Sequence, residues 1–268
     1  MNLVPTYYLN AIRQVLPFAY KAERPSIPGN SHNTLFVYDG DDTYVFKFNH
    51  FDMVSKNVRY SKLLAQAGVS VPDISMHTYK GSWMEVYKII PGRTLYECVH
   101  KGMDNRAVKS VYNDAVDDFI KMSDINLNLV PESSFKYIHQ VARQNVSDTS
   151  GKIAAKFLSN GVRIMNKQSG ENSMGLYHCG ITPKNIIVSP DGKYAGLVDM
   201  DEVAISNKNY AFGVMTEQYK RMGLDSDELI ALYEDKTLTK LDHKHLEFMG
   251  KVNDAGRWIM GKLGTRQR

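Results

Sequence analysis

The stretch that most constrains this chain runs from residue 176 to 202 and reads LYHCGITPKNIIVSPDGKYAGLVDMDE. A Pro-Asp-Gly turn at 190–192 separates two apolar runs, which is a strong β-hairpin signal because proline presets φ and glycine accepts positive φ. Such a hairpin brings the amide of Asn185, before its first strand, near the carboxylate of Asp199, after its second. Converging oxygen ligands of this kind suit a Mg²⁺ ion that carries a phosphate chain.

Composition and charge exclude several classes of protein. Of the 268 residues, 43% are apolar and 23% are charged, which is typical of a globular chain. The net charge of +4 is spread over interspersed acids and bases, so no basic stripe predicts nucleic-acid binding. Cys98 and Cys179 form neither a disulfide framework nor a metal cluster. With no secretory signal and no long apolar run, we expect a cytoplasmic protein without a membrane partner.

The first 90 residues are rich in strand signals. The Asp-Gly pair at 39–40 predicts a hairpin, Gly68 suits the position just after a helix, and Pro91-Gly92 marks a linker. The predicted elements are strands at about 34–38, 44–48, 74–79 and 83–90, and helices at about 6–16 and 53–66. This part is predicted to be a mostly antiparallel sheet with helices attached.

Beyond the linker, helical periodicity dominates. Apolar residues at i, i+3, i+4 and i+7 predict a packed helix at 104–122, and Ser226 stands where a helix cap is expected. Further helices are predicted at about 134–141, 153–165, 212–222, 227–233 and 241–263. We therefore predict an α+β, two-lobed fold, with a small antiparallel β lobe (1–90) and a larger helical lobe (91–268). The hairpin would face the cleft between the lobes.

Two N-terminal features suggest nucleotide binding. Lys47 projects from a predicted strand, and a small polar loop at 29–33 lies nearby in the sequence. A lysine and loop N–H groups can contact the phosphates of a nucleotide, although a lysine on an edge strand is more often simply solvated. The strand at 85–90, which runs into the linker, can offer backbone groups to a purine, or it can be an ordinary strand and turn.

The combination of segments resembles the aminoglycoside phosphotransferase and choline kinase family, whose fold is protein-kinase-like. The family motif H-G-D-x-x-x-x-N, followed by a strand and I-D-x-D, is similar to HCGITPKN at 178–185 and VDMD at 198–201. The resemblance extends to Lys47, to LLAQAGVSVP at 63–72 and to YKIIPGRTL at 87–95, so it spans most of the chain.

This resemblance implies a purine nucleotide, with ATP expected, and Mg²⁺ as cofactors. It places Asn185 and Asp199 as metal ligands and His178 as a brace for the loop. The residues predicted to contact the nucleotide are Ser31, Asn33, Lys47, Glu85 and Tyr87. The implied acceptor is a small hydroxylated molecule, such as an aminoglycoside, choline or a sugar.

Three acids of the family pattern are missing. Gly180 stands where the family has the aspartate that takes the proton of the acceptor hydroxyl. The helix at 53–66 offers no acid to pair with Lys47, and Asn57 lies near the expected position, so Lys47 is expected to be loosely held. Ala211 replaces a further acid. Loss of a general base typically costs about two to four orders of magnitude in rate.

Three hypotheses remain from the sequence. The favoured one is a nucleotide-binding pseudokinase or weak phosphotransferase, with a protein partner as an option. The second is an active ATP-dependent kinase of a small hydroxylated molecule that takes its base from Asp201, Glu202 or the substrate. The third is an interaction module that no longer binds nucleotide.

Overall fold

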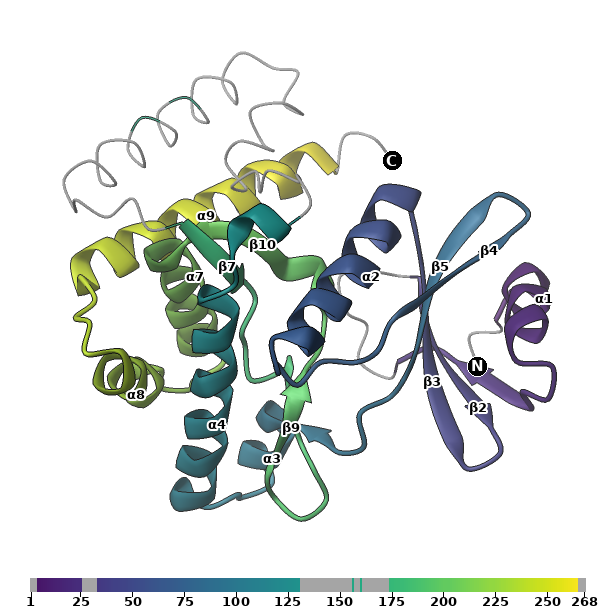
Figure 1. The fold of residues 1–268 in the computed structure, drawn as a ribbon, viewed down its shortest axis with the longest axis horizontal. Coiled ribbons are helices and arrows are strands. Elements are labelled where there is room, and N and C mark those ends of the chain that lie inside the picture. The colour runs from purple at the N-terminus through teal and green to yellow at the C-terminus, as the bar shows by residue number, and fades with distance from the viewer. Residues whose placement is uncertain (1–3, 26–32, 131–155, 157–159, 161–173, 265–268) are drawn as a thin grey trace.

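The computed structural model describes residues 4–25, 33–130, 156, 160 and 174–264. A β-rich lobe, purple and blue in Figure 1, lies beside a helical lobe in teal, green and yellow. This arrangement confirms the predicted α+β, two-lobed class. The helices predicted at 134–141 and 153–165 lie outside the described residues. No helix within the described ranges is long and apolar enough to cross a membrane.

The N-terminal lobe contains a single antiparallel sheet in the order β1-β2-β3-β5-β4. Its elements are α1 (Thr6–Val15), β1 (Lys21–Glu23), β2 (Thr34–Asp39), β3 (Asp42–Asn49), α2 (Phe51–Gln66), β4 (Ser75–Tyr79) and β5 (Ser82–Lys88). The four predicted strands and both predicted helices are confirmed, whereas β1 was not predicted. Gly68 follows the end of α2 with a φ of 76°, as the sequence indicated.

The C-terminal lobe surrounds two small sheets, β6-β8-β9 and β10-β7. Its strands are β6 (Arg93–Thr94), β7 (Met174–His178), β8 (Ile186–Val188), β9 (Tyr194–Leu197) and β10 (Val203–Asn207). Its helices are α3 (Leu95–His100), α4 (Asn105–Ser123), α7 (Lys208–Arg221), α8 (Asp227–Thr237) and α9 (His243–Gly264), with 3-10 turns η1 (Leu127–Leu129) and η2 (Met200–Glu202).

Several local expectations for this lobe need correction. No strand was predicted just before the loop at 178–185, but Met174–His178 forms strand β7, which pairs antiparallel with β10. Helix α7 begins four residues before its predicted start, because the side chain of Asn207 caps it by accepting from the N–H of Asn209 at 2.8 Å. Ser226 precedes α8 but makes no capping hydrogen bond with its side chain.

The linker is held against the central hairpin. Strand β6 follows the Pro91-Gly92 pair and lies antiparallel to β8, with Arg93 opposite Val188. Gly92 has a φ of 150°, and a Cβ built on it would lie 2.1 Å from the backbone oxygen of Val188. Only glycine fits such a close approach of two backbones. This contact fixes where the chain enters the C-terminal lobe.

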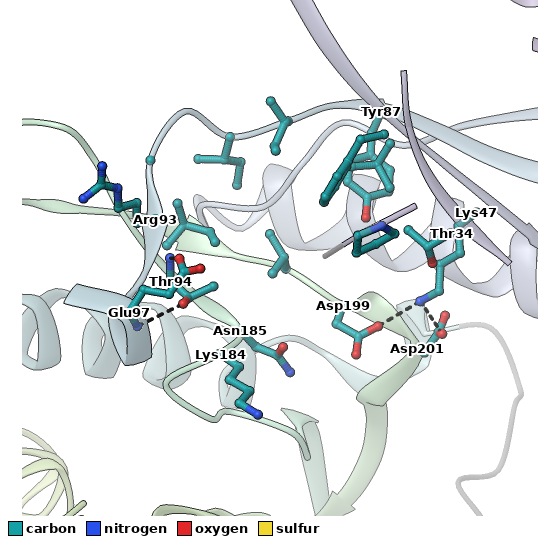
Figure 2. Close-up of a pocket in the computed structure, with 18 of the residues that line it drawn as sticks. Thr34, Lys47, Tyr87, Arg93, Thr94, Glu97, Lys184, Asn185, Asp199 and Asp201 are labelled. Atoms are coloured by element: carbon teal, nitrogen blue, oxygen red, sulfur yellow. Dashed lines mark hydrogen bonds and ion pairs between the residues drawn. The ribbon is translucent and has the colours of Figure 1, made fainter. Parts of the chain in front are cut away.

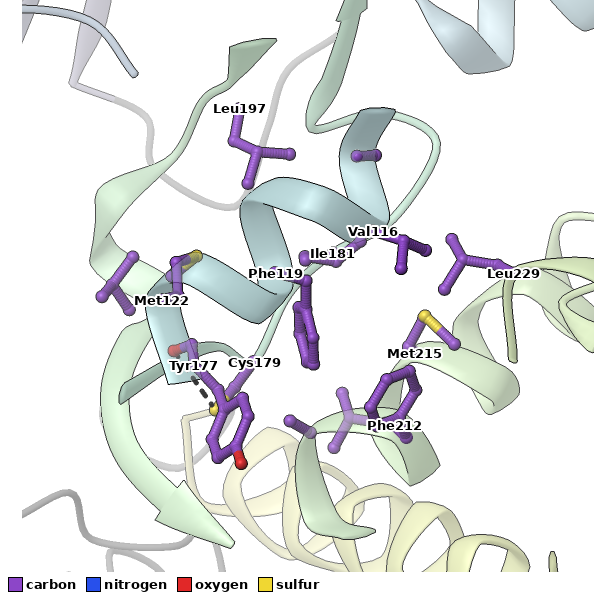
Figure 3. Packing of buried hydrophobic residues seen from close by; sticks show 14 of the residues in the cluster. Val116, Phe119, Met122, Tyr177, Cys179, Ile181, Leu197, Phe212, Met215 and Leu229 are labelled. Carbon is purple, nitrogen blue, oxygen red and sulfur yellow. Dashed lines mark hydrogen bonds between the residues drawn. The ribbon is translucent and has the colours of Figure 1, made fainter. Parts of the chain in front are cut away.

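A large apolar cluster supports the loop at 178–185 from behind. Figure 3 shows Phe119 of α4 between Tyr177 of β7 and Phe212 of α7, with ring centroids 5.2 and 4.7 Å apart. Cys179 and Ile181, within the loop itself, are buried in the same cluster. Burial raises the pKa of the Cys179 thiol to about 12, so this cysteine is a packing residue rather than a nucleophile.

Helices α7 and α9 touch through two glycines. A Cβ on Gly213 would lie 2.4 Å from the backbone oxygen of Leu246, and a Cβ on Gly250 would lie 2.7 Å from the backbone oxygen of Gly213. The two backbones therefore meet with no room for a methyl group at either position. This contact anchors α9 to the helix that follows β10.

We predict that Gly213→Ala destabilises the protein by about 1–3 kcal/mol, because the added methyl group forces α7 and α9 apart. In an open helix the same change would stabilise by roughly 1 kcal/mol, so the sign is diagnostic. Urea unfolding measures the difference. The control is Ser110→Ala, at an exposed position of α4, with an expected change within about 0.5 kcal/mol. A stabilised Gly213→Ala variant would contradict the close helix contact.

Candidate functional site

A cavity of about 550 Å³ opens between the two lobes (Figure 2). Its walls come from β2, β3 and β5, from the linker, and from the hairpin β8–β9 with the residues after it. Its apolar lining includes Phe36, Val45, Tyr87, Ile89, Ile90, Ile187 and Val198, and its polar lining includes Lys47, Lys184, Asn185, Asp199, Asp201 and Glu202. A mixed lining of this kind suits a ligand with a flat apolar part and a charged part.

Lys47 lies where the two lobes meet. Its Nζ is 2.8 Å from Oδ1 of Asp199 and also contacts the carboxylate of Asp201 (Figure 2). Burial alone would lower the pKa of Lys47, but the two aspartates outweigh it, and the pKa is raised. The expectation of a loosely held lysine is therefore wrong. Its acidic partners come from the segment after β9 rather than from α2.

Position 57 of α2, near which the family pattern has an acid, belongs to a buried polar network. Asn57 of α2 donates from Nδ2 to Oε1 of Glu85 at 2.8 Å and also to the carboxylate of Asp201. Glu85 lies on β5 directly opposite Lys47 on β3. Burial raises the pKa of Glu85 to about 7, and Lys47 offsets only part of this effect. Position 57 of α2 thus carries an amide that joins Glu85 to Asp201, rather than an acid that pairs with Lys47.

The predicted nucleotide contacts are only partly brought together. Lys47 and Tyr87 line the cavity, whereas Glu85 does not, because it lies deeper in the sheet, where Asn57 of α2 covers it. Asn33 precedes β2 and accepts a hydrogen bond from the N–H of Phe48 at 3.1 Å, but it does not line this cavity. Ser31 lies outside the described residues.

The loop at 178–185 is held in shape from within. His178 lies with Nε2 2.8 Å from the backbone oxygen of Val198, and its Nδ1 accepts from the N–H of Gly180 at 3.2 Å. Its proton is therefore on Nε2, and burial lowers its pKa, which keeps the ring neutral. The ring of His178 thus links the N–H of Gly180 to the backbone oxygen of Val198.

Asn185 closes the same loop by donating from Nδ2 to the backbone oxygen of Gly180 at 2.8 Å. This bond leaves Oδ1 as the amide atom able to face a cation. Asp199 lies nearby with φ 71° and ψ 61°, a left-handed conformation that costs a non-glycine residue on the order of 1 kcal/mol. Burial would raise the pKa of Asp199, but Lys47 lowers it overall, so the carboxylate stays charged. Strain of this kind often marks a functional position.

The donor atoms at this wall fit Mg²⁺ delivered with a nucleotide. Across the described residues, no group of three or more His, Cys, Asp or Glu side chains is placed to hold a metal ion by itself. Asn185 and Asp199 each offer oxygen, and both line the cavity. Mg²⁺ in nucleotide sites commonly takes one or two protein oxygens and completes its shell with phosphates and water.

Sequence reasoning missed several residues that line the cavity, among them Thr94 and Glu97. These two form a capping box at the start of α3: the N–H of Glu97 donates to Oγ1 of Thr94 at 3.2 Å, and the N–H of Thr94 donates to Oε2 of Glu97 at 3.1 Å. The Thr-x-x-Glu spacing is a readable signal for a helix start. It does not indicate that the start faces a cavity.

Solved structures share this architecture at low sequence identity. An aminoglycoside 2'-phosphotransferase in its GDP complex has a TM-score of 0.70 at 14% identity, over 97% of this chain and 92% of that chain. An aminoglycoside phosphotransferase from Streptomyces rimosus, with ADP and streptomycin, has a TM-score of 0.69 at 14% identity, over 94% and 98%. A choline kinase from Streptococcus pneumoniae has a TM-score of 0.67 at 13% identity, over 97% and 90%.

The chain has the fold of these phosphotransferases. The resemblance found in the sequence is thereby confirmed at the level of the fold. No protein-family model matches the sequence, and no curated protein is similar enough to count as a match. The roles of individual residues in this phosphotransferase-like fold therefore depend on the geometry of the cleft.

We predict that Glu85→Gln changes how stability depends on pH. The unfolded carboxyl has a pKa of 4.5 and the folded one about 7, so the folded state keeps a proton that the unfolded state releases. The contribution of Glu85 to stability is therefore present below pH 4.5 and is lost as the pH rises through 7. Glutamine mimics the protonated form and has no such loss.

Urea unfolding of both proteins at pH 5 and pH 8 measures this effect. From pH 5 to pH 8, the free energy of unfolding of the wild type is expected to fall relative to that of Glu85→Gln by on the order of 2–3 kcal/mol. Glu228→Gln, at a half-exposed position of α8, controls for the loss of a carboxylate. A difference between wild type and Glu85→Gln that does not change with pH would show that Glu85 is charged in the folded protein.

Proposed function

We propose that this protein binds a purine nucleotide, ATP as the first candidate, together with Mg²⁺ in the cleft between the lobes. The observation that carries the proposal is the pairing of Lys47 with Asp199, 152 positions apart in the chain, beside Asn185 on one wall of the cavity. The volume of about 550 Å³ is in the usual range for small-molecule sites. Solved complexes of the same fold with GDP and ADP support the choice of ligand.

In this proposal each group has a distinct part. Lys47 exchanges an aspartate for the phosphate chain, and its raised pKa keeps it positive. Asn185 and Asp199 hold Mg²⁺, which neutralises charge on the phosphates when it is bound. Val45, Tyr87 and Ile187 offer apolar surface to the purine. The presence of this charged wall argues against an interaction module that has lost nucleotide binding.

A second candidate function is transfer of the terminal phosphoryl group to the hydroxyl of a small molecule. It is favoured by the intact loop, in which His178 and Asn185 keep their bonds to Gly180 although that residue has no side chain. Proteins of this fold have been solved with streptomycin, and one is a choline kinase. Position 180 alone would instead favour a pseudokinase or a weak enzyme with a regulatory role.

Nucleotide binding predicts a thermal shift. MgATP at about 100 times its dissociation constant should stabilise the wild type by about 2.7 kcal/mol, because it binds only the folded state. Asp199→Asn and Lys47→Met should lose most of this shift, since each removes a charge from the wall that faces the phosphates. Lys21→Met on β1, at a half-exposed lysine outside the cavity lining, is the matched control and should keep it. No shift of the wild type at millimolar MgATP would refute nucleotide binding.

A further inference from the structure

The backbone of Gly180 lies directly against the side chain of Glu202. A Cβ built on Gly180 would lie 2.8 Å from Cγ, 3.0 Å from Cβ and 3.4 Å from Cδ of Glu202, and these are its three nearest atoms. The space into which a side chain at position 180 would point is therefore filled by Glu202. Two of these atoms belong to the inner part of the side chain, which cannot move aside as easily as its tip.

Glu202 is held in this place by its backbone. Its carbonyl oxygen accepts from the N–H of Cys179 at 2.9 Å, and its own N–H donates to the oxygen of Asp199 at 3.2 Å. The next residue, Val203, begins β10 and is paired with His178 at the end of β7. The β7–β10 register thus fixes Glu202 beside the residues of the loop that surround Gly180. This pairing was not visible in the sequence.

The two aspartates of this wall face Lys47. Asp199 and Asp201 both contact Lys47 (Figure 2). Asp201 also accepts a hydrogen bond from Asn57. Asp201 was the first candidate from the sequence for a substitute base, but its carboxylate is directed to Lys47 rather than to Gly180. Glu202 lines the same cavity, and its side chain lies against Gly180.

We propose that Glu202 supplies the carboxylate that the loop lacks at Gly180, which makes this protein an active phosphotransferase toward a small hydroxyl compound. The inference rests on the proposed nucleotide site. A glutamate reaching in from η2 takes the place of an aspartate reaching out from the loop. Gly180 is then the residue that leaves room for Glu202, and not the remnant of a lost function.

The step that Glu202 assists balances without any further reactant. The acceptor hydroxyl oxygen forms a bond to the terminal phosphorus of ATP, and the bond from that phosphorus to the bridging oxygen breaks, releasing ADP. The hydroxyl proton passes to the carboxylate of Glu202 and from there to water. No group is oxidised or reduced. General base assistance of this type typically contributes about two to four orders of magnitude in rate.

Steady-state ADP formation with MgATP tests the inference, with kanamycin, choline and water as the acceptors supplied. We expect the wild type to form ADP above the enzyme-free background with at least one of them. Glu202→Gln should lower kcat by about 10²- to 10⁴-fold with little change in KM for ATP. The same variant should keep the MgATP thermal shift, because it leaves Lys47, Asn185 and Asp199 in place. Glu228→Gln on α8 is the control and should behave as the wild type does.

Transferring the carboxylate from position 202 to position 180 provides a second, independent test. The double variant Gly180→Asp/Glu202→Ala should turn over at least about tenfold faster than Glu202→Ala alone, since it returns a carboxylate to the same space. Gly180→Asp in the presence of Glu202 should not raise the rate, because the two side chains compete for one volume. A large gain from Gly180→Asp alone would overturn the inference.

The outcomes also separate this inference from the proposed nucleotide site. Absence of a thermal shift with MgATP refutes both. A normal shift with no ADP formed by the wild type with any of the three acceptors refutes the inference and leaves a pseudokinase. Equal turnover of the wild type and Glu202→Gln, with both shifts retained, refutes the role of Glu202 alone.

Discussion

The cleft depends on a lysine that is neutralised from the opposite lobe. Lys47 belongs to the N-terminal sheet, and its side chain is only 9% exposed, whereas Asp199 and Asp201 belong to the C-terminal lobe. A buried charge without a partner costs several kcal/mol. The lysine therefore requires these two aspartates in the folded protein. Asp199 in turn takes a left-handed conformation to reach it. One ion-paired group thus links the two lobes at the wall of the cavity.

Much of this arrangement was readable from local signals. The hairpin around Pro190, the loop from His178 to Asn185 and the strand with Lys47 all depend on residues close together in the chain, and their turn chemistry is specific. The sequence did not show which of these side chains would contact one another. Asn57 meets Glu85 and Asp201, and Glu202 lies against Gly180, because strands and helices far apart in sequence are stacked in space. No periodicity in the sequence encodes such contacts.

The three missing acids therefore have three different explanations. At Asn57 no acid is needed, because Lys47 pairs with Asp199 and Asp201, and at Gly180 the carboxylate is proposed to come from η2. Ala211 is 2% exposed and packs in the apolar cluster of the C-terminal lobe. An acid there would have to be buried among apolar side chains, which is costly without a partner. A position-by-position comparison with the family motif records only a missing acid at each of the three positions and does not distinguish these explanations.

The fit between Gly180 and Glu202 also limits how such a site could have arisen. An aspartate in the loop and a glutamate in η2 compete for one volume, so a protein that carried both would have to displace one of them. A protein that carried neither would keep its fold, since the bonds of the loop are made by His178, Asn185 and the backbone. Removing one of the two carboxylates before introducing the other avoids this overlap.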